Sequence, residues 1–215
     1  MSDHQPGARL PSESDIGMIE SGEAEAYGHV AARAFHDDPA FRYLVPDDAR
    51  RRRGLPTFFR ASIDATAPEG ATFVARRGGV AAGVASWVPP GRYPLPAGTQ
   101  LRQAFGTLRA LLHAPRAIPD GVRALVAMDR THPHDEHWYL ALLCVDPAEQ
   151  SHGYGAALVM RGLERADADG LPAYLETSNP RNLAWYGRFG FVVERELRPW
   201  RAGPPLWTMR RPARG

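Results

Sequence analysis

The stretch from Trp138 to Ala156, WYLALLCVDPAEQSHGYGA, constrains the fold more than any other part of the chain. Its first eight residues, Trp138 to Val145, are all apolar or aromatic and predict a buried strand. A loop with a Gly-x-Gly pattern follows, and helix-forming residues then run from about Tyr154 to Asp169. Another apolar strand is expected at Ala173 to Thr177. This alternation of strand and helix indicates a mixed α/β fold.

The remaining sequence predicts further short strands and helices of the same kind. Residues 1–14 are rich in Pro, Ser and Gly, and we expect them to form a loose N-terminus. The expected elements are a strand at Ile16 to Ile19, a helix at Glu23 to Phe35, a helical region interrupted by Pro46, a hairpin of Thr72 to Arg76 and Val80 to Val88 turning at Gly78-Gly79, a Pro-rich loop at 89–96, helices at 99–114 and 121–130, a short helix at Leu183 to Phe189, and strands at Phe191 to Leu197 and Leu206 to Arg210.

Length and composition favour a single domain over residues 1–215. With 44% hydrophobic and 23% charged residues, the chain has the composition of a soluble globular protein. No apolar run approaches the roughly 18 residues that span a bilayer, and no apolar signal core opens the sequence, so we expect no membrane association and a cytoplasmic location. All 26 basic residues are Arg and the net charge is only +2, which gives no reason to expect a nucleic-acid partner. The single cysteine, Cys144, excludes an intramolecular disulfide, and we expect a buried thiol.

The Gly-x-Gly loop does not fit a dinucleotide fingerprint. Seven residues separate Val145 from Gly153, and Leu158 occupies the position of the third glycine. Backbone N–H groups around Gly153 and Gly155, with the positive end of the following helix, suit a pyrophosphate. A plain connector between strand and helix is the alternative.

Two segments together resemble the GNAT acyltransferases. The first is LALLCVDPAEQSHGYGAAL, with its strand ending in Val, Pro-containing turn and Gln-x-x-Gly-x-Gly pattern, and the second is ETSNPRNLAWYGRFGF. The combination is similar to puromycin N-acetyltransferase and related enzymes that acetylate small amines, and the resemblance covers about residues 137–211.

The resemblance implies a GNAT fold, in which helices cover both faces of a central mixed, mostly antiparallel sheet. That sheet would be splayed between the strands ending at Val145 and Thr177, with acetyl-coenzyme A as cosubstrate in the gap. Ser151 and His152 depart from the family, which often has Gly and a basic residue there, so backbone donors would carry more of the phosphate binding. The implied cosubstrate contacts are the backbone of Leu143, Cys144 and Val145 for the pantetheine arm, the residues Gln150, Ser151, His152, Gly153, Tyr154, Gly155 and Ala156 for the pyrophosphate, and the side chain of Asn182, for which helix capping is the alternative.

Two residues are candidates for proton transfer. Tyr186 matches the family's general acid, which would protonate the departing thiolate; packing between helix and sheet is the alternative. Glu176 ends an apolar strand, an unusual place for a carboxylate, and is either a general base or a structural acceptor of backbone N–H groups.

Candidates for the acceptor pocket are less specific. Trp138 and the aromatic side chains of Trp87 and Tyr93 could bound the pocket, with core packing as the alternative. Asp37 and Asp38 could attract a cationic amine, with a solvated loop as the alternative. The run HPHDEH (132–137) resembles the start of a metal motif, but Glu136 stands where Asp belongs, and we predict no metal site.

The resulting hypothesis is an acetyl-coenzyme A-dependent N-acetyltransferase that acts on a primary amine of a small molecule, either a metabolite or an antibiotic. The alternatives are a protein lysine or N-terminal acetyltransferase and a non-catalytic coenzyme A-binding module. Both a monomer and a homodimer are compatible with the sequence.

Overall fold

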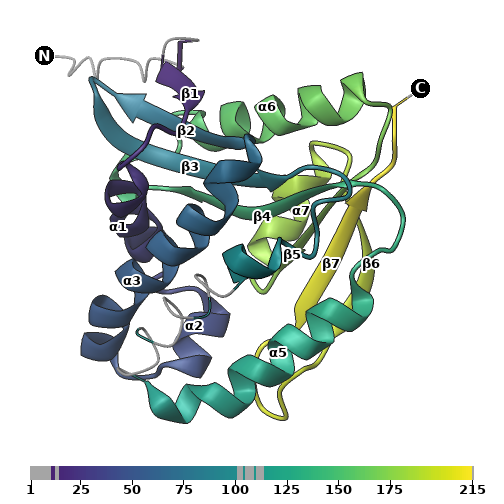
Figure 1. Ribbon diagram of the computed structural model, residues 1–215. Coiled ribbons are helices and arrows are strands. Elements are labelled where there is room, and N and C mark those ends of the chain that lie inside the picture. The colour runs from purple at the N-terminus through teal and green to yellow at the C-terminus, as the bar shows by residue number, and fades with distance from the viewer. Residues whose placement is uncertain (1–10, 13–14, 101–103, 105–108, 110–113, 215) are drawn as a thin grey trace, which may run out of the picture.

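The computed structural model describes residues 11–12, 15–100, 104, 109 and 114–214, and its strands form one sheet (Figure 1). Seven strands of the described ranges are arranged in the order β1-β2-β3-β4-β5-β7-β6. Every neighbouring pair is antiparallel except β4 and β5, which are parallel, so the expected mixed, mostly antiparallel sheet is confirmed. The strands are β1 (Ile16–Met18), β2 (Thr72–Arg77), β3 (Val80–Val88), β4 (Trp138–Val145), β5 (Ala173–Thr177), β6 (Val192–Leu197) and β7 (Leu206–Arg211).

The helices follow the sequence-based expectations with small shifts at their ends. Helix α5 begins at Ile118, three residues earlier than expected, because Pro119 suits the first turn of a helix. Most of the helix expected at 99–114 lies outside the described residues. In the described ranges, no helix is long and apolar enough to span a bilayer. The helices are α1 (Ala24–Ala34), α2 (Pro39–Leu44), α3 (Asp48–Thr66), α5 (Ile118–Thr131), α6 (Tyr154–Ala168) and α7 (Arg181–Gly187), with 3-10 turns η2 (Ala67–Glu69), η3 (Pro115–Ala117) and η4 (Pro147–Glu149).

Helices cover both faces of the sheet, as expected (Figure 1). Helices α1 and α3 pack on each other and against β3, with buried side chains that include Tyr27 and Phe59. Helix α6 packs on the opposite face, against β2, β3 and β4, through Leu158, Val159 and Leu163.

The hairpin of β2 and β3 turns at the predicted glycines. Gly78 has φ 58° and Gly79 has φ 82°. A two-residue turn with positive φ at both positions matches the right-handed twist of the strands it joins, and glycine adopts such angles without strain.

A bulge in β4 changes which face its side chains point to. Ser86 of β3 lies opposite Leu142, whereas the next residue, Trp87, lies opposite Leu140, so Ala141 is an extra residue in β4. Side chains alternate along a strand, and an inserted residue reverses the alternation beyond it. Leu140 therefore packs with α6, while Leu142 packs on the face of α1 and α3.

Candidate active site

The site begins where β4 and β5 part. The two strands pair through Trp138, Tyr139 and Leu140 of β4, opposite Ala173, Tyr174 and Leu175 of β5. Beyond Leu140, β4 continues to Val145 paired with β3, and β5 continues to Thr177 paired with β7. Within the described part of the chain, the β5-facing side of the second half of β4 thus has no strand partner. The expected splay is confirmed, and it starts at the bulge.

The loop between β4 and α6 has the backbone geometry of an anion site. Gly153 precedes the first turn of α6 with φ 86°, and the loop leads from the end of β4 directly into the N-terminal, positive end of this helix. The Gln150 amide donates to the carbonyl of Val145 at 3.3 Å, and the His152 imidazole bonds to the carbonyl of Glu149 at 3.2 Å. Both side chains thereby hold the loop in shape. A Cβ at Gly155 would lie 3.4 Å from Trp185, an ordinary van der Waals contact, so a methyl group would fit at that position.

Ser151 has φ 68°, a left-handed conformation that explains why glycine is common at this position in the family. A left-handed backbone costs a non-glycine residue roughly 1 kcal/mol, partly offset by the greater freedom of glycine in the unfolded chain. We expect Ser151→Gly to raise the free energy of unfolding by about 0.5 kcal/mol, measured by urea denaturation. The control Ser62→Gly, inside helix α3, should lower it by a similar amount. A loss of stability in Ser151→Gly would contradict the proposed strain.

Tyr186 lies on α7, which follows β5, and its side chain is buried. Burial raises the pKa of Tyr186 above its usual value, and the nearby Cys144 raises it further. The ring packs edge-on against Trp185 and Phe191, with centroids 5.0 and 5.8 Å away. The phenol is therefore firmly positioned, and it keeps its proton at neutral pH. Burial also raises the pKa of the Cys144 thiol to about 12, so this thiol is inert.

Asn182 ties α7 to the end of β5. Its amide donates to the hydroxyl of Thr177 at 3.0 Å. The residue that caps α7 is Pro180, so the capping alternative for Asn182 is wrong.

Glu176 is the first residue of β5 beyond the last pair with β4, so it lies at the base of the gap. Its side chain is 4% exposed, and its Oε1 atom has no hydrogen-bond partner among the described residues. No backbone N–H of the described residues donates to Oε1, so this atom gives the structural alternative no support. The pKa values of Tyr139 and Tyr174 are raised, first by burial and then by the negative charge of Glu176.

The two acidic residues expected in the acceptor pocket have different environments. Asp38 caps α2: its carboxylate accepts from the backbone N–H of Ala40 at 2.9 Å and from the hydroxyl of Ser178 at 3.0 Å. Burial raises the pKa of Asp38, although these hydrogen bonds oppose the shift. Asp37 is exposed, as a solvated loop residue would be. Asp38 thus links α2 to the end of β5, and its hydrogen-bonding capacity is largely used within the protein.

The structure corrects the expectation that Trp87 and Trp138 contact the acceptor. Trp87 is fully buried and packs against Gly162 of α6. Trp138 is 5% exposed, and its indole donates to the Asp169 carboxylate at 2.8 Å. Both rings belong to the core beneath α6, which leaves no surface for a ligand.

Sequence reasoning missed a buried cluster around Glu176. His132 lies at the end of α5, with its Nδ1 atom 3.8 Å from Glu176 Oε1, and its ring stacks on Tyr93 at 3.7 Å. Tyr139 and Tyr174 complete the cluster. The available signal was the run HPHDEH, which contains His132 and His137. Among the described residues, no group of three or more His, Cys, Asp and Glu side chains is placed to hold a metal ion.

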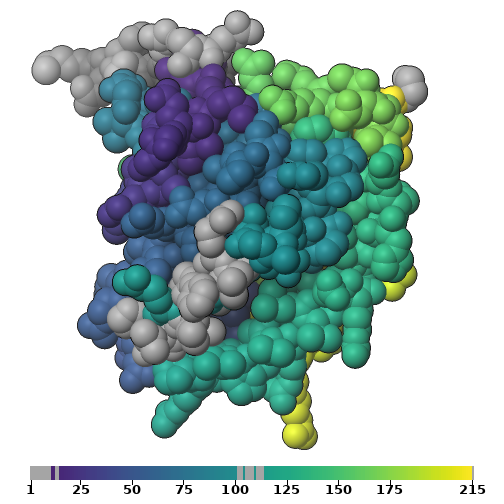
Figure 2. Space-filling model, in the orientation of Figure 1, coloured from purple at the N-terminus to yellow at the C-terminus, as the bar shows by residue number. Residues whose placement is uncertain are grey.

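Helix α5 connects the elements beside the gap. The Tyr43 hydroxyl of α2 donates to the Asp120 carboxylate at 3.1 Å, and the Trp200 indole donates to the Asp120 carbonyl at 2.8 Å. Because Trp200 lies between β6 and β7, α5 joins α2 to the far end of the sheet. Figure 2 shows the side chains of α5, in teal green, in front of the yellow C-terminal strands. A hollow of about 500 Å³ lies beside this junction, lined by Tyr43 and Asp120 together with Arg50 and Arg116.

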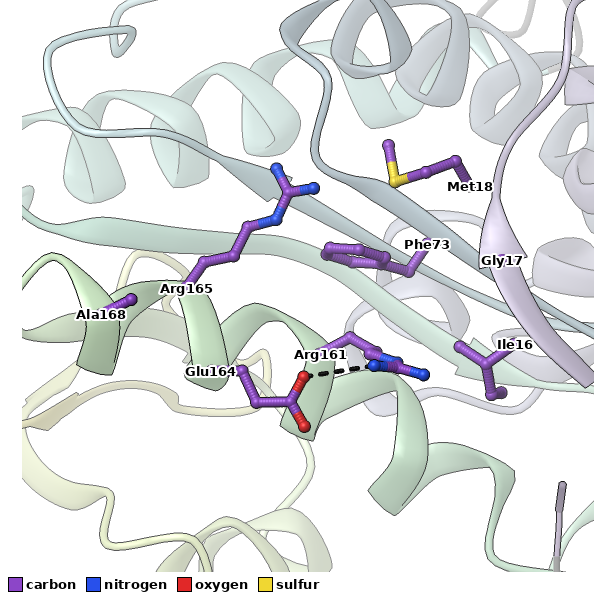
Figure 3. A pocket seen from close by; sticks show the side chains of 8 residues that line it. All are labelled: Ile16, Gly17, Met18, Phe73, Arg161, Glu164, Arg165 and Ala168. Carbon is purple, nitrogen blue, oxygen red and sulfur yellow. Dashed lines mark hydrogen bonds and ion pairs between the residues drawn. The ribbon is translucent and has the colours of Figure 1, made fainter. Parts of the chain in front are cut away.

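A different hollow, of about 370 Å³, lies at the opposite edge of the sheet (Figure 3). It is bounded by β1, β2 and α6. Arg165 lies over the ring of Phe73 at 5.1 Å, and Arg161 pairs with Glu164 at 3.4 Å. Its charged groups are engaged with their neighbours, and its lining comes from none of the residues around the gap.

Comparisons with known proteins agree with this geometry. The sequence profile of the Acetyltransferase (GNAT) family matches residues 31–191. An uncharacterized N-acetyltransferase of Schizosaccharomyces pombe is 28% identical over 189 residues, which are 81% of this chain and 74% of that protein. The crystal structure of histone acetyltransferase HPA2 and related acetyltransferase from Corynebacterium glutamicum superimposes with a TM-score of 0.70 at 25% identity, covering 93% of this chain and 96% of that one. Arylalkylamine N-acetyltransferase 2 from Aedes aegypti shares the fold, with a TM-score of 0.59 at 16% identity over 91% and 97% of the two chains. The chain therefore belongs to the GNAT family of acetyltransferases and is an N-acetyltransferase.

Proposed function

We propose that this enzyme transfers an acetyl group from acetyl-coenzyme A to a primary amine of a small molecule, with Tyr186 as the general acid. The observation that carries the proposal is the gap between β4 and β5, with the carboxylate of Glu176 at its base and the buried Tyr186 on α7, the helix that follows β5. A donor and an acceptor of protons beside one opening suit a reaction in which an amine loses a proton and a thiolate gains one.

The residues around the gap fit acetyl-coenzyme A, which members of this family use. The unpaired side of Leu143, Cys144 and Val145 offers backbone groups to the pantetheine amides, in the manner of an added strand. The loop from Gln150 to Ala156, with the helix start behind it, offers N–H groups to the pyrophosphate. The role of Asn182 beside the pantetheine arm is part of the same proposal.

The protein residues divide the chemistry as follows, with the bound thioester supplying the acetyl group. Glu176 takes a proton from the amine as its nitrogen attacks. A backbone N–H of β4 stabilises the oxyanion that develops on the carbonyl. Tyr186 gives its proton to the sulfur as the carbon–sulfur bond breaks. The raised pKa of Tyr186 keeps the phenol protonated until this step but also makes it a weaker acid than the thiol, so the proposed transfer requires close alignment of the hydroxyl with the sulfur.

A small acceptor is favoured over a protein because the acceptor side is covered. Helix α5 is tied to α2 through Tyr43 and to the β6–β7 link through Trp200. Tyr93 and Leu95, from the loop after β3, pack onto β4 and β5 and narrow the space further. One structural relative is named as a histone acetyltransferase, so an amine of a protein is the second candidate for the acceptor.

Acetyl-coenzyme A should raise the thermal unfolding midpoint, while NAD should not. At 100 times its dissociation constant a ligand adds about 2.7 kcal/mol, or roughly 5 to 11 °C for a chain of this size. A stabilising effect then justifies a thiol-release assay with small amines, puromycin among them, and with lysine-containing and N-terminal peptides. No rise, or an equal rise with NAD, would contradict the cosubstrate. Turnover of peptides alone would replace the small acceptor with a protein.

A further inference from the structure

His132 and His137 form a buried pair beside Glu176. Their Nε2 atoms are 3.0 Å apart, and the Nδ1 atom of His137 lies 2.7 Å from the carbonyl oxygen of Asp135. On its other side, His132 presents Nδ1 to Glu176 Oε1 at 3.8 Å, with both side chains about 5% exposed. The side chains of His137, His132 and Glu176 therefore place their nitrogen and oxygen atoms in one row.

The hydrogen bonds determine which ring nitrogen of each histidine carries a proton. A carbonyl oxygen only accepts, so His137 must carry its proton on Nδ1. Burial is the largest influence on His137 and lowers its pKa, which keeps the ring neutral at pH 7 and leaves Nε2 as an acceptor. His132 must then donate from its own Nε2. Its Nδ1 atom then carries a lone pair and faces Glu176 Oε1 at 3.8 Å, so it is placed to accept a proton that reaches this carboxylate if the two groups move slightly closer.

The surroundings of Glu176 suit acceptance of a proton from the amine. Its Oε1 atom is buried without a hydrogen-bond partner in the described part of the chain, which is costly for a charged oxygen, and its charge acts on the nearby phenols of Tyr139 and Tyr174. Tyr93 stacks on the His132 ring, while Tyr139 and Tyr174 contact it edge-on at 4.9 and 5.1 Å. Glu176 and His137 face His132 as well, and two further carboxylates act on the surrounding phenols: Asp129 of α5 on Tyr93, and Glu194 of β6 on Tyr174. Arg210 lies farther out, where its guanidinium binds the carboxylate of Asp135 on the outer side of the link.

We infer that His132 is a positioning residue that shares the proton of the acceptor amine with Glu176, while His137 holds its imidazole in the required tautomer. The inference rests on the proposed function. As the carbon–nitrogen bond forms, the proton released by nitrogen passes to Glu176 and is shared with Nδ1 of His132. The electron pair of the breaking carbon–sulfur bond leaves on sulfur, which receives the proton of Tyr186. Exchange with solvent then restores both groups.

The test compares two acceptors in the variant His132→Asn. A lysine-like alkyl amine, with a pKa of about 10.4, must lose a proton to react, whereas an α-amine near 8 is already partly neutral. We expect kcat to fall about fivefold with the alkyl amine and less than twofold with the α-amine. The variant His137→Asn should show the same selective loss at smaller size. The exposed His134, in the same link, gives the control His134→Asn, with no change for either amine.

Two results would overturn the inference. Equal losses with both amines would show that His132 only supports the fold, and unchanged kinetics would show that Glu176 acts without it. Acetyl-coenzyme A binding, measured by thermal shift, shows whether each variant is folded. If His132→Asn does not fold, the same comparison of two amines is made with His137→Asn. If the wild-type enzyme acetylates neither amine, the proposed function fails instead.

Discussion

Replacing Tyr186 with Phe should lower kcat at least tenfold and leave acetyl-coenzyme A binding nearly intact. The change removes one hydroxyl from a buried ring that otherwise packs against Trp185 and Phe191. Without the phenol, the thiolate must leave unprotonated or take its proton from water, and general acid catalysis typically contributes about 100-fold or more. Steady-state kinetics of thiol release, with the thermal shift as the measure of binding, checks both parts of the expectation.

Tyr27 provides the matched control. It is also buried, its pKa is also raised to about 12 by burial, and its hydroxyl donates a long 3.5 Å hydrogen bond to Ala75 in the core beneath α1. Tyr27→Phe should leave kcat unchanged. A Tyr186→Phe enzyme with wild-type turnover would remove Tyr186 as the acid. Because its pKa is raised, Tyr186 should cause no loss of rate below about pH 10 in the wild-type enzyme.

Replacing Gly162 with Ala should destabilise the protein by about 3 kcal/mol. A Cβ at this position would lie 2.0 Å from Cε2 and 2.2 Å from Nε1 of Trp87. The Trp87 ring is fully buried between β3 and α6, so either the helix or the ring must shift. The thermal midpoint should fall by roughly 6 to 12 °C in a scan without ligand.

Gly121 shows what the same substitution does without a close neighbour. It lies in α5, and a Cβ there would have no heavy atom of the described residues within 4 Å, apart from its own helix backbone and chain neighbours. Gly121→Ala should raise stability by about 0.5 to 1 kcal/mol, because alanine favours the helix. If both substitutions changed stability by similar amounts, glycine at position 162 would not be required by the close packing of Trp87 on α6.

The sequence predicted best those elements that have strong local signals. The bounds of β4 and β5 were predicted to the residue, since each is an apolar run closed by turn residues. Helix α6 was predicted to within one residue at its end, and the Gly78-Gly79 turn was correct. The family's two sequence segments added the splay, which no local pattern would have indicated.

The contacts between distant segments were not predictable in the same way. Which face Trp87 and Trp138 point to depends on the register of β3 and β4 and on the bulge at Ala141. The run HPHDEH gave no indication that His132 meets Glu176, because the two lie on different elements and 44 positions separate them. Asp38 was similarly expected to face a ligand, whereas its partner Ser178 comes from a distant loop.

The short pairing between β4 and β5 divides the sheet into two halves that, among the described residues, are joined by three residue pairs. One half is β1 to β4 and the other is β5, β7 and β6. In the proposed complex, the pantetheine arm supplies the hydrogen bonds that a neighbouring strand would otherwise make along the rest of β4. Binding of the cosubstrate would then add hydrogen bonds between the two halves, and its release would remove them. Each turnover would therefore make the middle of the sheet more rigid and then more flexible again.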